Sequence, residues 1–402
     1  MQRRTTLRLA ALAMALAAAP GFAQKNYGPG VSDTEIVIGQ TQAYSGPLSA
    51  FGTLGKVEEA WFRKVNDEGG VNGRKIRLIS LDDAYSPPKT LELTRKLVEQ
   101  DNVLAIFSTM GTPTNTSIHR YLNGKKVPHL LISSGASKWN DPKNFPWSLG
   151  FNPNFHTEGK TYAQLILKTK PDAKIGLLYP NDDFGKDYTN GFKEGLGDKQ
   201  KMIVSEQTYT STDPTVDSQL VALKASGADV FFNVGTPKFA AQAIRKAGEL
   251  GWKPMQFLNN ASSSIGATLV PAGVEHAVGI VTVQYLKDAT NKRWAEDPGI
   301  AEFKTFMQKY YPQGDLKDFV NTMGVAHAQT MVQILKQCGD DLSRENVMRQ
   351  ATNLKDLQLS VMIPGVKINT SPDDHAPIES VQMVRFDGAE WVPFGEIMGL
   401  GR

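Results

Sequence analysis

The chain has 402 residues, of which 41% are hydrophobic and 21% are charged, and its formal net charge is +3. This length favours two domains, and this composition is that of a globular protein and excludes a disordered or fibrous one. Its single cysteine, Cys338, excludes an intrachain disulfide.

The N-terminal segment predicts export. A basic start, "MQRRTTLR", precedes the apolar run "LAALAMALAAAP" and the small residue that ends "GFA". This order is typical of a secretory signal peptide over residues 1–23, so we expect cleavage after Ala23 and a periplasmic location. A buried N-terminal helix is the alternative, but the segment has no polar face. No later stretch has the ~20 apolar residues of a membrane span, so we expect no membrane-embedded part.

Loss of the signal changes the charge balance. The signal holds three of the 44 basic residues and no acid, which leaves 41 basic residues against 41 acidic ones. A chain without net charge gives no support for nucleic acid or an anionic membrane surface as a partner.

Strand and helix signals alternate regularly in the first part of the expected mature chain. Near-continuous apolar strands are predicted at 34–42, 75–83, 103–109 and 127–133. Helices are predicted between them at 55–70, 89–100 and 116–126. This alternation indicates a parallel sheet that is covered by helices on both faces.

The same pattern then starts again. Four further strands are predicted at 174–180, 202–209, 229–235 and 255–260, with helices at 184–197, 217–227 and 237–251. The section after about residue 286 is mainly helical, and 381–397 alternates around Asp387-Gly388 as a β-hairpin does. We expect an α/β fold of two doubly wound parallel-sheet lobes joined by a three-strand hinge. The lobes are predicted to comprise residues 24–150 with 286–357, and residues 151–285 with 358–402.

Loops rich in hydroxyl groups and glycine follow three strands of the first unit, at 43–52, 108–117 and 133–137. Ligands of open α/β sheets bind outside the carboxyl ends of the strands, where these loops lie. Hydroxyls and free backbone N–H groups near helix starts bind a carboxylate without a cationic side chain. The alternative is that three hydroxyls only cap helices, namely those of Ser45, Thr112 and Ser137.

Signals for an enzyme or a cofactor are absent from the sequence patterns. The loops lack the phosphate-binding G-x-x-x-x-G-K-S/T and dinucleotide-binding G-x-G-x-x-G motifs. The six histidines form no H-E-x-x-H pair, and there is no G-x-S-x-G motif. We therefore expect no catalytic residue, no metal and no cofactor, and we disfavour a secreted α/β hydrolase.

Three stretches carry a family resemblance: "TEIVIGQTQAYSGPLSAFG", "VNDEGGVNGRKIRLISLDDAYSPPKTLELTRKLVEQDNVLAIFS" and "VPHLLISSGAS". They resemble the exported substrate-binding proteins of ABC importers, in the branched-chain amino-acid (leucine/isoleucine/valine) binding-protein family. The resemblance runs from about Thr34 to Gly251 and more loosely to the end. It implies a type I periplasmic binding fold and a monomer that closes around one small molecule. It also implies delivery of this molecule to a membrane permease and its ATPase.

The resemblance also implies a set of ligand-binding positions. Residues of the second and third loops would bind a ligand carboxylate, namely Thr112, Thr114, Gly135, Ala136 and Ser137, and Met110 is a further ligand-binding position. Phe51 and Phe184 match the family's ligand-binding aromatics, and Thr236 and Ala261 match two further positions in the second lobe.

Ala261 departs from the family pattern. Amino-acid binders commonly carry a Glu or Asp there, which pairs with the ligand's α-ammonium. A buried ammonium without such a partner would cost several kcal/mol. We therefore favour an aromatic or aliphatic acid without an α-amino group. The alternatives are a branched-chain or other amino acid, with Asp182 or Asp183 as the acid, and a sensory module for a chemoreceptor or kinase.

Overall fold

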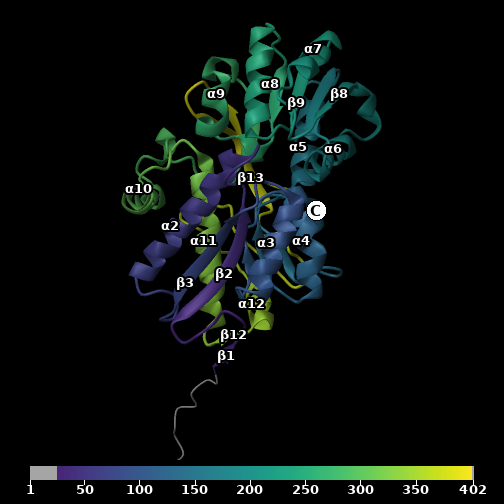
Figure 1. Ribbon diagram of the computed structural model, residues 1–402. Helices are drawn as coiled ribbons and strands as arrows, with labels where there is room; N and C mark the ends of the chain where they lie inside the picture. Colours follow the sequence, from purple (N-terminus) through teal and green to yellow (C-terminus); the bar gives the residue numbers. More distant parts are fainter. Residues whose placement is uncertain (1–24, 401–402) are drawn as a thin grey trace, which may run out of the picture.

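The structure, a computed structural model, describes residues 25–400. Two main β-sheets form the cores of two lobes, one above the other in Figure 1. The sheet of lobe 1 has the strand order β3-β2-β4-β5-β6, and all of its strands run parallel. Its strands are β2 (Glu35–Gln42), β3 (Lys75–Asp82), β4 (Ile106–Phe107), β5 (His129–Ile132) and β6 (Ser148–Gly150).

The sheet of lobe 2 has the order β14-β13-β11-β10-β9-β7-β8. Its parallel strands are β7 (Ile175–Pro180), β8 (Ile203–Tyr209), β9 (Val230–Asn233), β10 (Met255–Leu258) and β11 (Val281–Gln284). The predicted hairpin is confirmed: β13 (Ser380–Phe386) and β14 (Trp391–Gly399) pair antiparallel, and β13 also pairs antiparallel with β11. Gly388 in its turn has φ +106°, which favours glycine.

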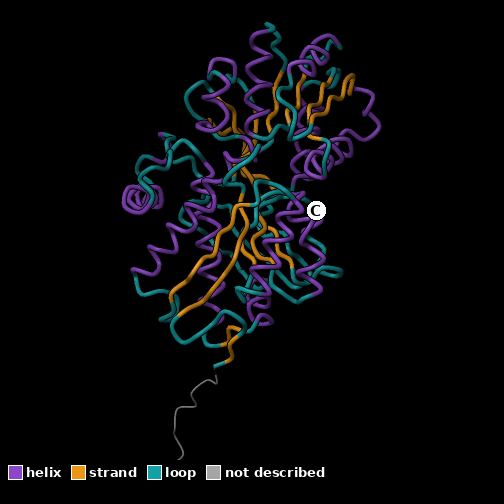
Figure 2. Tube along the Cα trace, viewed as in Figure 1, coloured by secondary structure: helices purple, strands orange, loops and turns teal. Residues whose placement is uncertain are grey.

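Helices lie on both faces of the sheets, as Figure 2 shows in purple around the orange strands. The first unit contains α2 (Thr53–Asp67), α3 (Pro87–Glu99) and α4 (Thr112–Gly124). The second contains α5 (Phe155–Thr169), α6 (Asp183–Leu196), α7 (Asp217–Ala225), α8 (Pro237–Glu249) and the short α9 (Val270–Ala272). The predicted class, an α/β type I periplasmic binding fold with two doubly wound lobes, is confirmed.

The later helices return to lobe 1. They are α10 (Pro298–Tyr310), α11 (Phe319–Cys338) and α12 (Arg344–Ala351). Helices α10 and α11 pack against α2, and β12 (Asp341–Leu342) pairs with β1 (Asn26–Tyr27). Because the chain starts in lobe 1 and ends in the sheet of lobe 2, it passes between the lobes three times. The exact lobe boundaries stay a prediction.

The largest differences from the predicted elements are a much shorter β4 and an unpredicted α5, and β6, β11 and α9 were not predicted either. Strand β4 ends at Phe107 because Ser108 has a left-handed conformation, with φ +50°. Helix α5 lies before the strand predicted at 174–180, in a segment for which the sequence analysis predicted no element. Its N-cap is Asn154, whose Oδ1 accepts a hydrogen bond of 3.0 Å from the Thr157 N–H. Within residues 25–400, no helix is both long and apolar enough to cross a membrane.

Candidate functional site

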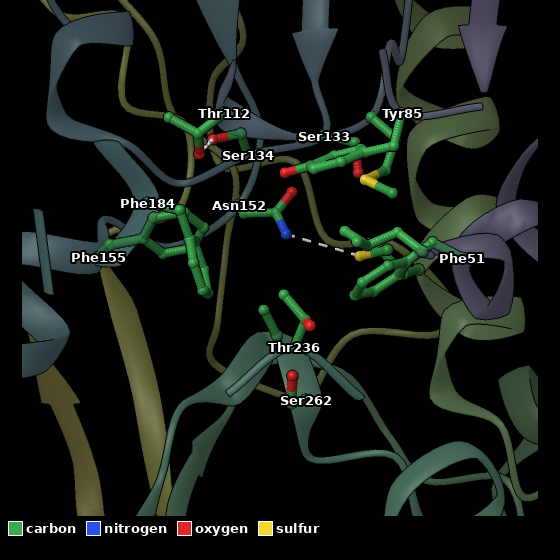
Figure 3. A pocket seen from close by; sticks show the side chains of 15 residues that line it. Phe51, Tyr85, Thr112, Ser133, Ser134, Asn152, Phe155, Phe184, Thr236 and Ser262 are labelled. Carbon is green, nitrogen blue, oxygen red and sulfur yellow. Dashed lines mark hydrogen bonds between the residues drawn. The ribbon is translucent and has the colours of Figure 1, made fainter. Parts of the chain in front are cut away.

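A cavity with an empty volume of about 490 Å³ lies between the two lobes (Figure 3). Fifteen residues line it: Leu48, Phe51, Tyr85, Met110, Gly111, Thr112, Ser133, Ser134, Asn152, Phe155, Phe184, Thr236, Ala261, Ser262 and Met323.

The wall from lobe 1 is largely apolar, and Tyr85 forms part of it. The backbone that presents Tyr85 is unusual, since Ala84 and Tyr85 have φ values of +52° and +58°. A Cβ added to Gly111 would lie 2.3 Å from Cε2 of Tyr85, and Gly111 itself has φ +97°. The ring of Tyr85 can therefore lie against this backbone only because residue 111 is glycine.

A polar edge of the cavity is formed where β4 and β5 end. The hydroxyls of Thr112 and Ser134 lie 2.8 Å apart, and both side chains are buried. Thr112 opens α4, and the first N–H groups of a helix have no acceptor in a preceding turn. Such a helix start attracts an anionic group, because its N–H groups and the helix dipole both favour negative charge.

Aromatic rings from lobe 2 form the facing wall. The ring centroids of Phe155 and Phe184 are 5.1 Å apart in an edge-to-face contact, and Phe155 stacks on Tyr188 at 4.6 Å. Phe155 begins α5 and Phe184 lies in the first turn of α6, so the packing of these two helices builds the wall.

A buried carboxyl group, Glu158, lies one helical turn after Phe155. It accepts hydrogen bonds from the hydroxyls of Tyr162 and Tyr188, at 2.8 and 2.9 Å, and from the Asn260 N–H at 2.7 Å. Burial raises the pKa of Glu158 to about 7, although these donors act in the opposite direction. Glu158 does not line the cavity.

The remaining wall of the cavity comes from the ends of β9 and β10. Thr236 precedes α8, and its N–H donates to the Tyr209 hydroxyl at 2.9 Å. The Ser262 hydroxyl donates to the Gly235 carbonyl at 2.6 Å. Ala261, beside Ser262, contributes only a methyl group.

The structure brings six of the ten predicted site residues to this cavity: Phe51, Met110, Thr112, Phe184, Thr236 and Ala261. The other four lie elsewhere. The Thr114 hydroxyl is turned back to the carbonyls of Met110 and Gly111. Gly135 and Ala136 line a smaller neighbouring cavity, and Ser137 contacts Asp187. The role of the six in ligand binding stays a prediction.

Nine lining residues were not predicted: Leu48, Tyr85, Gly111, Ser133, Ser134, Asn152, Phe155, Ser262 and Met323. Ser133 and Ser134 belong to the small-residue turn after β5, so their neighbourhood carried a signal. Met323 lies on α11, far away in the sequence, and no local pattern connects it to the site.

Charge is absent from the lining of this cavity. None of its fifteen residues is Asp, Glu, Lys, Arg or His. The two acids considered as ammonium partners also have other roles. Asp182 caps α6 and accepts a hydrogen bond from the Gly185 N–H at 3.1 Å. Asp183 forms a 2.6 Å ion pair with Lys138.

Polar contacts join the two lobes next to Phe184 in the sequence of α6. Ser137, in the short 3₁₀ helix η2 (Ser137–Trp139), donates from its N–H and its hydroxyl to the Asp187 carboxylate of α6, at 2.9 and 2.5 Å. The ion pair of Lys138 with Asp183 lies beside them. These contacts join the end of β5 in lobe 1 to the first turns of α6 in lobe 2.

A buried cluster lies behind the loop after β4. Ser108 Oγ is 2.5 Å from Glu58 Oε1 and 2.6 Å from His327 Nδ1. All three side chains are fully buried. Burial raises the pKa of Glu58 well above its usual value and lowers that of His327 to about 3. This arrangement joins α2, α11 and the loop that carries Met110.

Comparisons with known proteins agree with this fold. The periplasmic binding protein family matches residues 35–390 of the chain. Leu/Ile/Val-binding protein homolog 7 of Brucella suis is 23% identical over 298 residues, which are 71% of this chain and 73% of that protein.

Two solved structures have the same fold. A branched-chain amino-acid ABC transporter protein from Thermus thermophilus, solved with bound valine, has a TM-score of 0.83 at 18% identity and covers 92% of this chain and 97% of its own. A fatty acid ABC transporter substrate-binding protein from Thermomonospora curvata has a TM-score of 0.78 at 21% identity, covering 93% and 95%. The predicted resemblance to substrate-binding proteins of branched-chain amino-acid ABC importers is therefore confirmed, and the chain belongs to the periplasmic binding protein family.

Proposed function

We propose that this protein captures a small carboxylic acid without an α-amino group and delivers it to an ABC permease and its ATPase. The observation that carries this proposal is the absence of any acidic side chain among the fifteen residues that line the cavity. An α-ammonium buried there would lack a charged partner, at a cost of several kcal/mol.

The carboxylate is assigned to the polar edge near Thr112 and Ser134. This edge supplies a helix start and hydroxyl groups. The body of the ligand would then lie between Phe51 on one side and Phe155 and Phe184 on the other (Figure 3). Rings on both sides suit an aromatic or branched aliphatic body.

The relatives bind ligands that agree with this chemistry in part. Valine is bound in the Thermus structure, and the Thermomonospora protein is described as a fatty acid binder. Both ligands carry a carboxylate, but only valine carries an ammonium. We assign to the present protein the carboxylate that they share.

A binding role without catalysis is part of the proposal. The Ser108, His327 and Glu58 cluster contains the residue types of a hydrolytic triad, but all three side chains are fully buried. Ser108 could not reach a substrate in the cavity without local unfolding.

A thermal-shift screen tests the proposed function. Residues 24–402 would be heated with benzoates, phenylpropanoids, short aliphatic acids and the amino acids. A ligand at 100 times its Kd adds about 2.7 kcal/mol of stability, which raises the melting temperature measurably. We expect stabilisation by acids without an amino group. Stabilisation by leucine or valine alone would contradict the proposal.

A further inference from the structure

One polar side-chain atom that lines the cavity, Asn152 Oδ1, has no hydrogen-bond partner within residues 25–400, whereas the Thr236 hydroxyl lies beside the hydroxyl of Tyr209. Asn152 lies between β6 and α5, and its side chain points toward the middle of the cavity (Figure 3). Its Nδ2 lies 3.6 Å from the sulfur of Met323, which is a weak acceptor. Thr236 faces the cavity from lobe 2.

An unpaired acceptor in a buried site is costly, because it has lost its bonds to water without replacement. A ligand that offers a hydrogen to the amide oxygen of Asn152 removes this cost. The ligand carboxylate cannot do so, because an ionised carboxylate is itself only an acceptor. The donor must be a second polar group on the ligand.

The charge of the lining decides between the two common donors, a hydroxyl and an ammonium. An ammonium would enter a cavity whose fifteen lining residues include no carboxylate. A hydroxyl brings a hydrogen without a charge, and its oxygen can also accept a hydrogen from the Thr236 hydroxyl.

We infer that the ligand is a hydroxy acid, whose uncharged hydroxyl donates a hydrogen bond to Asn152 Oδ1. This inference rests on the proposed function, since it assumes that a carboxylic acid occupies the cavity. It adds a second recognised group and names Asn152 as the residue that selects it.

Calorimetric titration with four acids of related skeleton tests the inference. The probes are 3-phenylpropionate, 3-phenyllactate, 3-(4-hydroxyphenyl)propionate and phenylalanine. At least one of the two hydroxylated acids is expected to bind about ten- to one-hundred-fold more tightly than 3-phenylpropionate, because it pairs an otherwise unpaired acceptor.

Matched variants locate the effect. The quantity compared is the Kd of 3-phenylpropionate divided by the Kd of the tighter-binding hydroxylated acid. Asn152→Leu and Thr236→Val should each reduce this ratio, with the larger reduction for Asn152→Leu. The controls Asn321→Leu and Thr268→Val make the same changes at two buried residues whose side-chain oxygens are unpartnered but do not line the cavity. They should keep the ratio, which is measured within one variant and so does not depend on the fraction folded.

The outcomes separate this inference from the function on which it rests. Equal affinity for hydroxylated and parent acids would overturn the hydroxyl inference and leave the carboxylic acid proposal standing. Preference for phenylalanine would overturn both. A further case is that none of the four acids binds, although the thermal-shift screen finds another acid without an amino group. The affinities of that acid and of its hydroxylated form would then be compared, and equal values would overturn the hydroxyl inference. If the screen found no such acid, the proposed function itself would fail.

Discussion

Gly111 is the residue on which the shape of the polar edge depends. It combines a left-handed φ with close contact to the Tyr85 ring, and it directly precedes the first turn of α4. A side chain there would move either the ring or the helix start. The Tyr85 ring and the start of α4 both line the cavity, so a side chain at residue 111 should mainly reduce the affinity for the ligand.

Gly111→Ala should therefore weaken ligand binding by at least tenfold and destabilise the fold by about 1–3 kcal/mol, because alanine strains at positive φ and contacts Tyr85. Calorimetric titration and urea unfolding measure the two effects. Gly124→Ala, at the other end of α4, is the matched control, since a Cβ there meets nothing within 4 Å. Equal behaviour of the two variants would contradict the role assigned to Gly111.

Ala261 is the residue at which the predicted ligand class can be changed. Ala261→Glu places a carboxylate in the uncharged lining of the cavity. We expect it to lower the affinity for acids without an amino group, by repulsion, and to raise the affinity for phenylalanine or leucine. Titration of both ligand classes against the variant measures this exchange. Unchanged discrimination would show that position 261 does not meet the ligand's α-substituent.

At the scale of elements, helix α5 connects the cavity to a buried carboxyl group. Phe155 lines the cavity, and Glu158 receives three hydrogen bonds behind it. Because the pKa of Glu158 is raised in the folded protein, the free energy of unfolding should decrease as the pH rises.

The pKa of Glu158 is about 7 in the folded protein and near 4.5 in the unfolded chain. Between these values the folded state holds a proton that the unfolded state releases, so raising the pH favours unfolding. The free energy of unfolding of the wild type should fall relative to Glu158→Gln by up to about 3 kcal/mol between pH 4.5 and 7. Urea unfolding over this range measures the difference. Parallel curves for the two proteins would contradict the raised pKa.

The contact of η2 with α6 is the second element-scale feature. Asp187→Ala removes the acceptor of both Ser137 hydrogen bonds. The conformation in which the two lobes are in contact should be destabilised by about 1 kcal/mol relative to one in which they are apart. Ligand binding should therefore weaken about three- to tenfold. The ligand-free protein should also have a larger radius of gyration, measured by X-ray scattering. Asp172→Ala, in the exposed turn after α5, removes the same charge away from this contact and should change neither quantity.

Most elements follow from local sequence patterns, and the exceptions have physical reasons. Eight of the ten parallel strands lie within predicted strand segments, whereas β6 and β11 were not predicted. Strand β4 is shorter because the hydroxyl of Ser108 bonds to Glu58 and His327 in a left-handed turn, and neither partner is near in sequence. Helix α5 carries a capping residue, Asn154, which could have indicated its start.

At the scale of the whole molecule, the site is built from both lobes and from α11, and this limits what the sequence predicts. Six cavity residues follow from the family resemblance. Tyr85 depends on two successive left-handed residues, and Met323 depends on the return of the chain to lobe 1. Such contacts join distant segments, so no local pattern indicates them.

The central claim is that the uncharged cavity between the lobes binds a carboxylic acid without an ammonium group. Its most direct test is a parallel calorimetric titration of the wild-type protein, residues 24–402, with two matched pairs. The pairs are 3-phenylpropionate with phenylalanine, and 4-methylpentanoate with leucine, which differ only in the α-amino group. The account predicts that in at least one pair the acid without the amino group binds at least tenfold more tightly. Failure of the acid without the amino group to bind more tightly in either pair would contradict it.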